Sequence, residues 1–316
     1  MTLRRLFDRT GFSLVGAVDK APHLVGKDLG EIMGVSRAKG IKVQADLRSA
    51  VEATKPDVCI VMTVSDLKRI ESQLEQALLG GTHVVSTCEE LSFPWKRDAG
   101  FSERIDQLAR KQGKVVLGTG VNPGFLMDFL PQALTAVCHK VDSVLVERFQ
   151  DASSRRLPFQ QKIGAGLTPE EFATKQREGT LRHVGLEESM HLIAAKLGWE
   201  LDRTEDNLEP IIAQQDWVGA DRTIPAGNAL GVLQRGHGYR DGNEVITLHF
   251  HAAVGTENPR DRIVITGEPR IDSTIAGGVQ GDVATCSIVL NSCAAVLHAS
   301  PGLRHMGDIP SVSCHS

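Results

Sequence analysis

The sequence predicts an α/β protein with two domains, a parallel sheet covered by helices and an α+β domain. Three observations predict this class. Within residues 12–120, apolar stretches of strand length alternate with amphipathic stretches of helix length, as in sheets of parallel strands buried on both faces. From about residue 141, stretches such as "EVITLHFHAAV" alternate in polarity, which is typical of antiparallel strands with one exposed face. Near the end, "GDVATCSIVLNSCAAVLHA" is apolar enough for a buried helix.

The elements of the first domain can be placed in order along the chain. Residues 2–9 have the pattern of the last turns of a helix, with Gly11 as the stop signal. Four strands and three helices follow, with strands expected at 12–19, 57–64, 83–88 and 114–120 and helices at 46–54, 66–81 and 101–113. This order is that of a Rossmann-type sheet.

The usual beginning of such a sheet has no counterpart in this sequence. A first strand and a Gly-x-Gly-x-x-Gly turn normally precede the strand expected at 12–19, and that turn binds the pyrophosphate of a dinucleotide. Here the pattern opens within the first helix. We expect that the sequence begins at an internal methionine of a longer product. The alternative is a lineage that lost nucleotide binding.

The second domain is expected to interrupt the first. Residues 168–198 have the pattern of helices broken by glycine, and strand patterns lie on both sides of them. The last apolar helix, expected at 281–299, would pack back on the parallel sheet. We therefore expect one domain to comprise residues 1–127 with 281–316, and the other to comprise residues 128–280.

The composition limits the partners of the protein. The chain has 316 residues and a formal net charge of −4, which favours neither nucleic acid nor an acidic membrane surface as a partner. No apolar run approaches the ~20 residues of a membrane span. The six cysteines include no Cys-x-x-Cys pair, so we expect no metal site and a reducing, cytoplasmic setting.

Small and polar residues stand where the expected strands end, and parallel sheets bind ligands at that edge. Asp19 could hold the ribose hydroxyl of NAD and repel the extra phosphate of NADP, unless Lys20 offsets it, so NAD is slightly favoured over NADP. Ordinary capping and turn chemistry, with Ser65 as a helix N-cap, is the alternative. The other expected cofactor contacts are Thr63, Val64, Ser65, Cys88, Thr119, Gly120, Asn122 and Pro123.

Two adjacent carboxylates, Glu89 and Glu90, follow the apolar strand expected at 83–88. Acids at a strand end can be a solvated turn, which is the simplest interpretation of the pair. Their place beside the expected cofactor edge makes them candidate catalytic groups instead.

Several long motifs together resemble one family. The motifs "STCEELSFPW", "GTGVNPGFLMD", "FQQKIGAGLTPEEF" and "IAGGVQGDVAT" are similar to those of the 2,4-diaminopentanoate dehydrogenase family and its relatives, the native amine dehydrogenases, within the dihydrodipicolinate reductase-like proteins. The resemblance implies a Rossmann domain and a second domain that builds the substrate pocket and a homodimer interface. It also implies interconversion of an amine with a ketone and ammonia, using NAD or NADP, and a catalytic glutamate within "CEEL".

This chemistry gives the acids a role. One carboxylate can take a proton from ammonium, return it as water leaves, and stabilise the iminium that receives hydride. The spacing after the paired valines of the strand favours Glu89, with Glu90 turned toward a helix end or Arg97. Substrate contacts are expected from Val121, Leu126, Phe129, Gln161, Ile163, His183 and Thr285.

Two other functions fit the same sequence. One is an imine or dihydrodipicolinate-type reductase without an ammonia step, and the other is a non-catalytic binding protein in which the glycine-rich turn is truly lost. For the first interpretation, the expected partners are a small ketone or amine, such as 2-amino-4-oxopentanoate or a simpler ketone or aldehyde, and ammonia.

Overall fold

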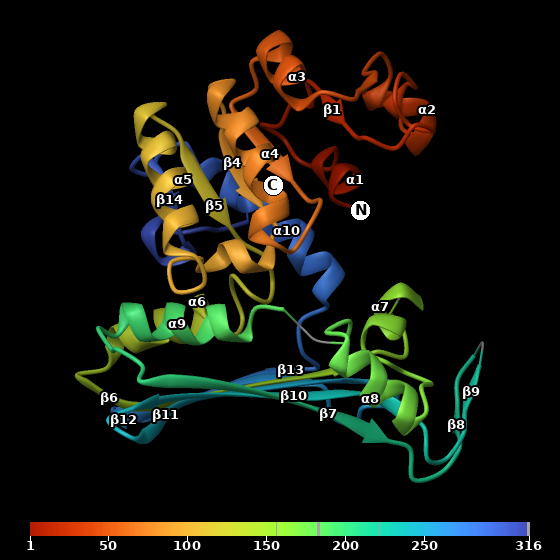
Figure 1. Ribbon diagram of the computed structural model, residues 1–316, viewed down its shortest axis with the longest axis vertical. Coiled ribbons are helices and arrows are strands. Elements are labelled where there is room, and N and C mark those ends of the chain that lie inside the picture. The colour runs from red at the N-terminus through yellow and green to blue at the C-terminus, as the bar shows by residue number, and fades with distance from the viewer. Residues whose placement is uncertain (156, 182–183, 221, 315–316) are drawn as a thin grey trace. The chain divides into compact units, whose positions relative to one another are not determined.

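The computed structural model describes residues 1–155, 157–181, 184–220 and 222–314, which form two compact units (Figure 1). Unit 1 comprises Met1–Phe125 with Gly281–Ser316, and unit 2 comprises Leu126–Gln280. Unit 1 contains a parallel sheet, and unit 2 contains a mainly antiparallel one. The fold class predicted from the sequence is confirmed. None of the helices in the described ranges combines the length and the apolar character that a transmembrane span requires.

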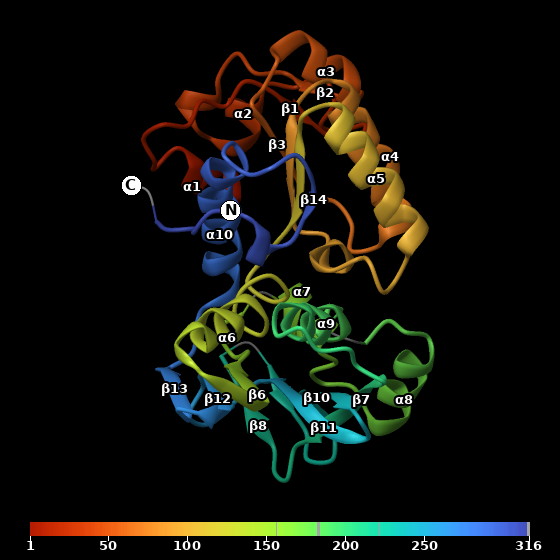
Figure 2. The same cartoon turned by 90° about the vertical axis from the view of Figure 1, so that its left-hand side faces the viewer.

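The main sheet of unit 1 has four parallel strands in the order β14-β5-β4-β3. The strands are β3 (Val58–Val61), β4 (His83–Ser86), β5 (Val115–Gly118) and β14 (Gly302–Arg304). The helices are α3 (Leu47–Thr54), α4 (Leu67–Leu79), α5 (Ala99–Lys111) and α10 (Gly281–Val296), and the short 3-10 turns are η2 (Glu89–Ser92) and η4 (Met306–Asp308). Figure 2 shows α4 and α5 on one face of this sheet and α10 on the other. The apolar faces of α4 and α5 therefore form one buried core with the strands that these helices cover.

The register of this sheet brings three strand ends together. Val61 of β3 pairs with Ser86 of β4, and Ser86 pairs with Gly118 of β5. The Ser86 hydroxyl donates to the Val61 carbonyl at 3.0 Å, and the Cys88 amide donates to the Ser86 hydroxyl at 3.1 Å. Since the strands are parallel, the loops that follow them leave the sheet at one edge.

The N-terminal segment differs from what the sequence predicts. It contains α1 (Thr2–Leu6), β1 (Ala17–Val18), α2 (Leu29–Met33), η1 (Ser36–Ala38) and β2 (Val43–Gln44). The strand expected at 12–19 is wrong in length, because only Ala17 and Val18 pair, with β2 in a separate two-stranded sheet. An apolar run becomes a strand only where its backbone finds a partner, and within the described residues β2 alone pairs with it.

Asp28 organises the segment between β1 and β2. Its carboxylate accepts hydrogen bonds from the amides of Gly30 at 2.8 Å, Glu31 at 3.2 Å and Gly40 at 2.6 Å. These bonds cap α2 and join it to the loop before β2. The Gly40 amide, followed by the other two, holds the pKa of Asp28 below its usual value.

Replacing Asp28 with alanine is therefore expected to reduce the hydrogen-exchange protection of the Gly40 amide. A carboxyl whose folded pKa is depressed stabilises the fold above its unfolded pKa of about 3.9, and that contribution is lost as the pH falls through the folded pKa. Protection of Gly40 in the unmodified protein should follow this pH course. The Ser49 amide, which Asp46 caps, is the internal control, and equal losses at Ser49 and Gly40 in the variant would contradict the prediction.

Unit 2 is built on a six-stranded sheet in the order β13-β12-β6-β11-β10-β7. Its strands are β6 (Lys140–Asp151), β7 (Arg203–Ile212), β10 (Ala229–Arg240), β11 (Asn243–Ala253), β12 (Arg260–Glu268) and β13 (Ile271–Ala276). A hairpin of β8 (Trp217–Val218) and β9 (Thr223–Ile224) extends from it. The helices are α6 (Phe129–Leu134), α7 (Leu157–Lys162), α8 (Pro169–Arg177) and α9 (Leu186–Lys196), and η3 (Thr135–Val137) follows α6. Only β6 and β11, among neighbours in the sheet, run parallel.

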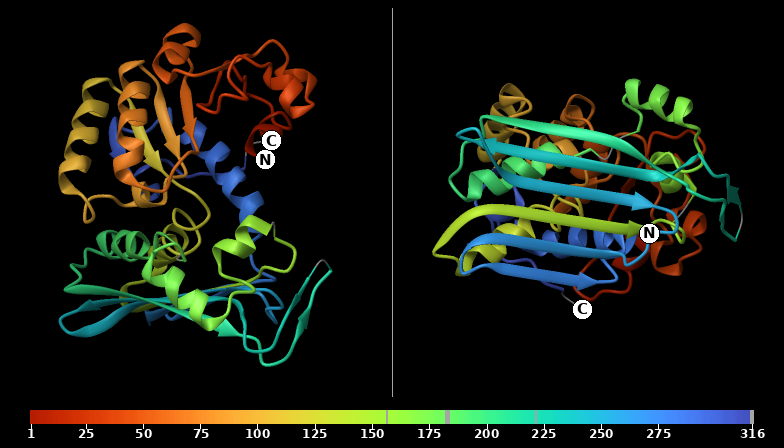
Figure 3. Two further views of the ribbon diagram at one scale, coloured as in Figure 1. Left: turned by 45° about the vertical axis from the view of Figure 1, so that its right-hand side comes forward. Right: turned by 90° about the horizontal axis from the view of Figure 1, so that it is seen from below.

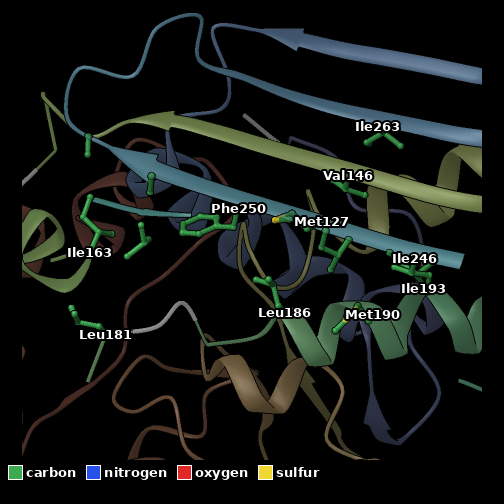
Figure 4. Packing of buried hydrophobic residues seen from close by; sticks show 14 of the residues in the cluster. Met127, Val146, Ile163, Leu181, Leu186, Met190, Ile193, Ile246, Phe250 and Ile263 are labelled. Carbon is green, nitrogen blue, oxygen red and sulfur yellow. The ribbon is translucent and has the colours of Figure 1, made fainter. Parts of the chain in front are cut away.

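The core of unit 2 lies between this sheet and its helices. Figure 3 shows the six strands side by side from below, with the helices of the unit on the far face of the sheet. In Figure 4, Leu186, Met190 and Ile193 of α9 point toward Ile246 and Phe250 of β11. Inward-facing residues alternate along the strands, so the alternation seen in the sequence marks the buried face.

One ion pair is buried in this sheet. Arg148 of β6 and Asp261 of β12 are cross-strand neighbours, with side chains 1% and 5% exposed and an Nη1–Oδ1 distance of 2.8 Å. Arg148 also donates through Nη2 to the Val279 carbonyl at 3.0 Å, and Asp261 accepts from the Val279 amide at 2.7 Å. The pair thus fixes the backbone at Val279, just after β13.

Candidate active site

A cavity of about 290 Å³ lies in unit 1 at the carboxyl ends of β3, β4 and β5. This is the edge at which open parallel sheets bind their ligands. Three loops and the first turns of α10 supply its walls. The lining residues are Met62, Thr63, Val64, Ser65, Thr87, Glu89, Thr119, Gly120, Val121, Asn122, Pro123 and Thr285.

The loop between β3 and α4 is held by its own polar groups. The Asp66 carboxylate caps α4 by accepting from the Arg69 amide at 3.0 Å. The Thr63 hydroxyl donates to the Gln73 side chain at 2.8 Å. Asp66, and not Ser65, is therefore the N-cap, which leaves Ser65 on the wall of the cavity.

The end of β5 and the loop after it pack so closely against neighbouring backbone that Gly118 and Gly124 have no room for a side chain. A Cβ on Gly118 would lie 2.4 Å from the Leu91 backbone of η2, so β5 and η2 are in direct contact. A Cβ on Gly124, whose φ is +116°, would lie 2.4 Å from the Gly120 nitrogen. The Thr119 amide donates to the Ser86 carbonyl at 2.8 Å. These contacts hold residues 119–123 against the strand ends.

The two adjacent glutamates of η2 have different surroundings. Glu89 lines the cavity, and Glu90 is buried away from it. Glu90 accepts from the Leu67 amide at 3.0 Å and pairs with Arg97 at 2.8 Å, while its own amide donates to the Ser65 carbonyl at 3.4 Å. A 3-10 turn has three residues per turn, so neighbouring side chains point in different directions. Glu90 therefore joins η2 to the start of α4.

Replacing Glu90 with alanine is expected to lower the free energy of unfolding by about 1–3 kcal/mol, because the buried Leu67 amide loses its acceptor. Glu90→Gln retains an acceptor for that amide and should cost less. Chemical denaturation of both variants measures the difference. If the two variants are equally stable, the bond to Leu67 does not contribute as the geometry indicates.

Two of the cofactor contacts expected from the sequence, Asp19 and Cys88, are not among the residues that line the cavity. Asp19 is exposed at the end of β1 and accepts from the Ala21 amide at 2.8 Å. Cys88 does not line the cavity but is packed in the apolar core of unit 1, because consecutive residues of an extended chain face opposite sides and Thr87 faces the cavity. Burial raises the pKa of the Cys88 thiol to about 12.

The residues proposed for the substrate divide between the units. Val121 and Thr285 line the cavity in unit 1. In unit 2, Leu126 is buried, Phe129 begins α6, Gln161 is exposed on α7, and Ile163 lies in the core. His183 lies outside the described residues. The contacts proposed for the five residues beyond unit 1 stay predictions.

Two lining residues, Met62 and Thr87, were not proposed from the sequence. Both directly follow a strand, at Val61 and at Ser86. The rule that ligands bind beyond the carboxyl ends of parallel strands would have found them if every residue after each strand had been included.

The lining residues suit the neutral ring and amide of a nicotinamide better than a phosphate. Met62, Val64, Val121 and Pro123 are apolar, and the polar residues are hydroxyl or amide bearing apart from Glu89. The close backbone packing at Gly120, where a Cβ would lie 3.0 Å from the Pro123 carbonyl oxygen, keeps this wall free of a side chain. Flat ligands bind where the backbone itself forms the wall.

Comparisons with known proteins agree with these features. A family model described as the 2,4-diaminopentanoate dehydrogenase C-terminal domain matches residues 125–315. The 2,4-diaminopentanoate dehydrogenase of Acetoanaerobium sticklandii is 30% identical over 316 positions, covering 96% of this chain and 88% of that protein. An amine dehydrogenase of Streptomyces virginiae is 22% identical, over 98% of this chain and 92% of that protein. The solved structure of an amine dehydrogenase from Mycobacterium smegmatis shares the fold, with a TM-score of 0.85 and 23% identity, over 99% of this chain and 93% of that one.

Proposed function

We propose that this chain, which belongs to the 2,4-diaminopentanoate dehydrogenase family, catalyses the reversible reductive amination of a small ketone with ammonia. On its family membership it is an oxidoreductase that acts on a CH–NH2 group with a nicotinamide cofactor. The observation that carries the finer proposal is the position of Glu89, the sole carboxylate among the described residues that line the cavity.

The reaction requires a group that both accepts and donates a proton. An ionised carboxylate can take a proton from ammonium, which releases the ammonia that attacks the carbonyl carbon. The protonated carboxyl can then return the proton to the departing hydroxyl, which leaves as water. The carboxylate that remains stabilises the iminium cation by its charge. We assign these steps to Glu89.

The other lining residues position the reactants. The backbone of 119–123 and the apolar side chain of Val64 would hold the nicotinamide ring, and Val121 would contact the substrate. When bound, the cofactor supplies the hydride that reduces the iminium carbon.

We propose NAD as the preferred cofactor because Asp19, although it does not line the cavity, directly follows β1 with an exposed carboxylate. A carboxylate at that place can accept from the ribose hydroxyls and repels a phosphate.

The experiment that tests this function follows the absorbance of NADH in the presence of 2-amino-4-oxopentanoate and a panel of simple ketones and aldehydes. NADH should be consumed only when ketone and ammonium are both present, and faster than NADPH. Consumption with a preformed cyclic imine and without ammonium would instead indicate an imine reductase. A fluorescence titration that detects neither NADH nor NADPH binding would favour the non-catalytic interpretation.

A further inference from the structure

The Thr119 hydroxyl is a buried polar group on the cavity wall. Thr119 is 3% exposed, and it is one of the residues that line the cavity, directly after β5. Within the described ranges its Oγ1 has no hydrogen-bond partner, although its backbone amide donates to the Ser86 carbonyl at 2.8 Å. Native proteins seldom leave a buried hydroxyl unpaired, so an isolated one indicates an absent partner.

Two neighbouring hydroxyls are already used within the protein. The Thr63 hydroxyl, on the same cavity, donates to Gln73. The Ser86 hydroxyl, one strand away from Thr119, donates to the Val61 carbonyl. Thr119 differs from both because its backbone amide is bonded to Ser86 while its buried hydroxyl has no partner among the described residues. A ligand in the cavity is the partner that this arrangement fits.

The proposed chemistry in the cavity indicates which atom of the substrate the Thr119 hydroxyl would contact. Glu89 holds the proton taken from ammonium while ammonia attacks, and the leaving hydroxyl needs that proton later. A carbonyl oxygen that is attacked by ammonia gains negative charge, which a further donor held in a fixed position stabilises. A threonine hydroxyl can donate.

We infer that the Thr119 hydroxyl donates a hydrogen bond to the oxygen of the substrate, from the carbonyl through the hydroxyl that leaves as water. This inference rests on the proposed function. The oxygen would thus meet a fixed donor directly after β5, in addition to the proton that Glu89 of η2 takes from the nitrogen and later gives to the oxygen.

The steps balance without a proton from Thr119. Ammonium transfers one proton to Glu89, and the resulting ammonia forms the C–N bond as the C=O π bond opens onto oxygen. A proton then passes from nitrogen to oxygen to give the neutral carbinolamine. Glu89 returns its proton to the hydroxyl, the C–O bond breaks, and water and the iminium cation result. Thr119 only donates a hydrogen bond throughout.

The test compares Thr119→Val, which removes the hydroxyl at nearly constant shape, with Thr119→Ser, which retains it. Thr119→Val should lower kcat for the ketone about 100-fold, in the range found for the loss of one oxyanion donor. Its dissociation constant for NADH, measured by fluorescence, should stay within about twofold of the unmodified protein. Thr119→Ser should recover most of the lost rate.

The control is Thr82→Val, which removes another buried threonine hydroxyl from the opposite end of β4, where it donates to the His83 carbonyl. This variant should keep the full rate. If Thr119→Val weakens NADH binding instead of lowering kcat, the hydroxyl serves the cofactor and the inference is overturned. A Thr119→Ser variant as slow as Thr119→Val would also overturn it, because packing would then explain the loss. If the unmodified protein itself consumes no NADH with ketone and ammonium, the proposed function fails rather than the role of Thr119.

Discussion

Replacing Glu89 with glutamine is expected to slow ammonia-dependent NADH oxidation by a factor of about 10²–10⁴, the usual contribution of a general acid and base. Glutamine has a similar shape but can neither take a proton from ammonium nor return one to the departing hydroxyl. It also lacks the charge that stabilises the iminium. The rate with saturating ketone and ammonium measures the effect.

Two comparisons make this expectation specific. NADH affinity, measured by fluorescence titration, should change little in Glu89→Gln, because the variant keeps the walls of the cavity. Glu90→Gln should cost much less activity, since Glu90 is bonded to Leu67 and Arg97 and lies outside the cavity. A larger loss of rate in Glu90→Gln than in Glu89→Gln would reverse the assignment of the two acids.

Replacing Arg148 with methionine is expected to lower the free energy of unfolding of the protein by about 3–5 kcal/mol, because it leaves a buried charge without its partner. Asp261 is 5% exposed and would keep only the Val279 amide among its described hydrogen bonds. Denaturant unfolding, followed by circular dichroism, measures the loss.

The pH dependence of this loss follows from Asp261. Burial raises the pKa of Asp261 above its usual value, and Arg148 opposes that shift. A folded state with a raised carboxyl pKa binds more protons than the unfolded state between the two pKa values, so stability falls as the pH rises through that range. Without Arg148 the pKa of Asp261 should rise further, so the fall should extend to higher pH, and the variant should be closest to the unmodified protein in mildly acidic solution.

Two further variants distinguish the effect of the unpaired charge on stability from the effect of the lost side-chain volume. The double variant Arg148→Met with Asp261→Leu removes both charges, and it should recover part or all of the stability. Arg48→Met breaks the ion pair with Glu52, whose side chains are 51% and 53% exposed, and should change stability by less than about 1 kcal/mol. A double variant as unstable as Arg148→Met would show that the unpaired charge is not the cause.

The helices that pack on the main sheet of unit 1 could be predicted closely from local signals. The sequence predicts a helix at 66–81, and α4 spans Leu67–Leu79, with the Asp66 cap at one end and Gly80 at the other. These signals lie within the helix itself, so no distant contact is needed to place its ends.

Strands depend on partners that sequence patterns do not reveal. The apolar stretch at 12–19 contains a paired strand of only two residues, Ala17–Val18. The short elements between Leu29 and Gln44 were not expected at all, because Asp28 and the close contact of Gly30 with the Lys39 backbone hold them together. Such contacts join residues that are not related by the spacing of a helix or a strand, so the sequence pattern does not reveal them.

The place of the candidate site could also be predicted, with only part of its detail. Glu89 and most of the residues around it were proposed because strand ends converge in a parallel sheet. The sequence directs Glu90 toward a helix end or Arg97, and Glu90 bonds the start of α4 and Arg97, but the 3-10 turn η2 that separates the two acids was not indicated. Cys88, proposed as a cofactor contact, packs in the core, because one position along the chain separates the cavity wall from the core.

The close contact at Gly118 has a consequence for redesign. Any side chain at this position would overlap the Leu91 backbone. The turn that carries Glu89 therefore packs directly on the backbone of β5 and has no room to shift toward it. Variants with new substrate ranges should therefore be made by substituting Met62 and Val121, which line the cavity. Glu89 should keep its position in such variants.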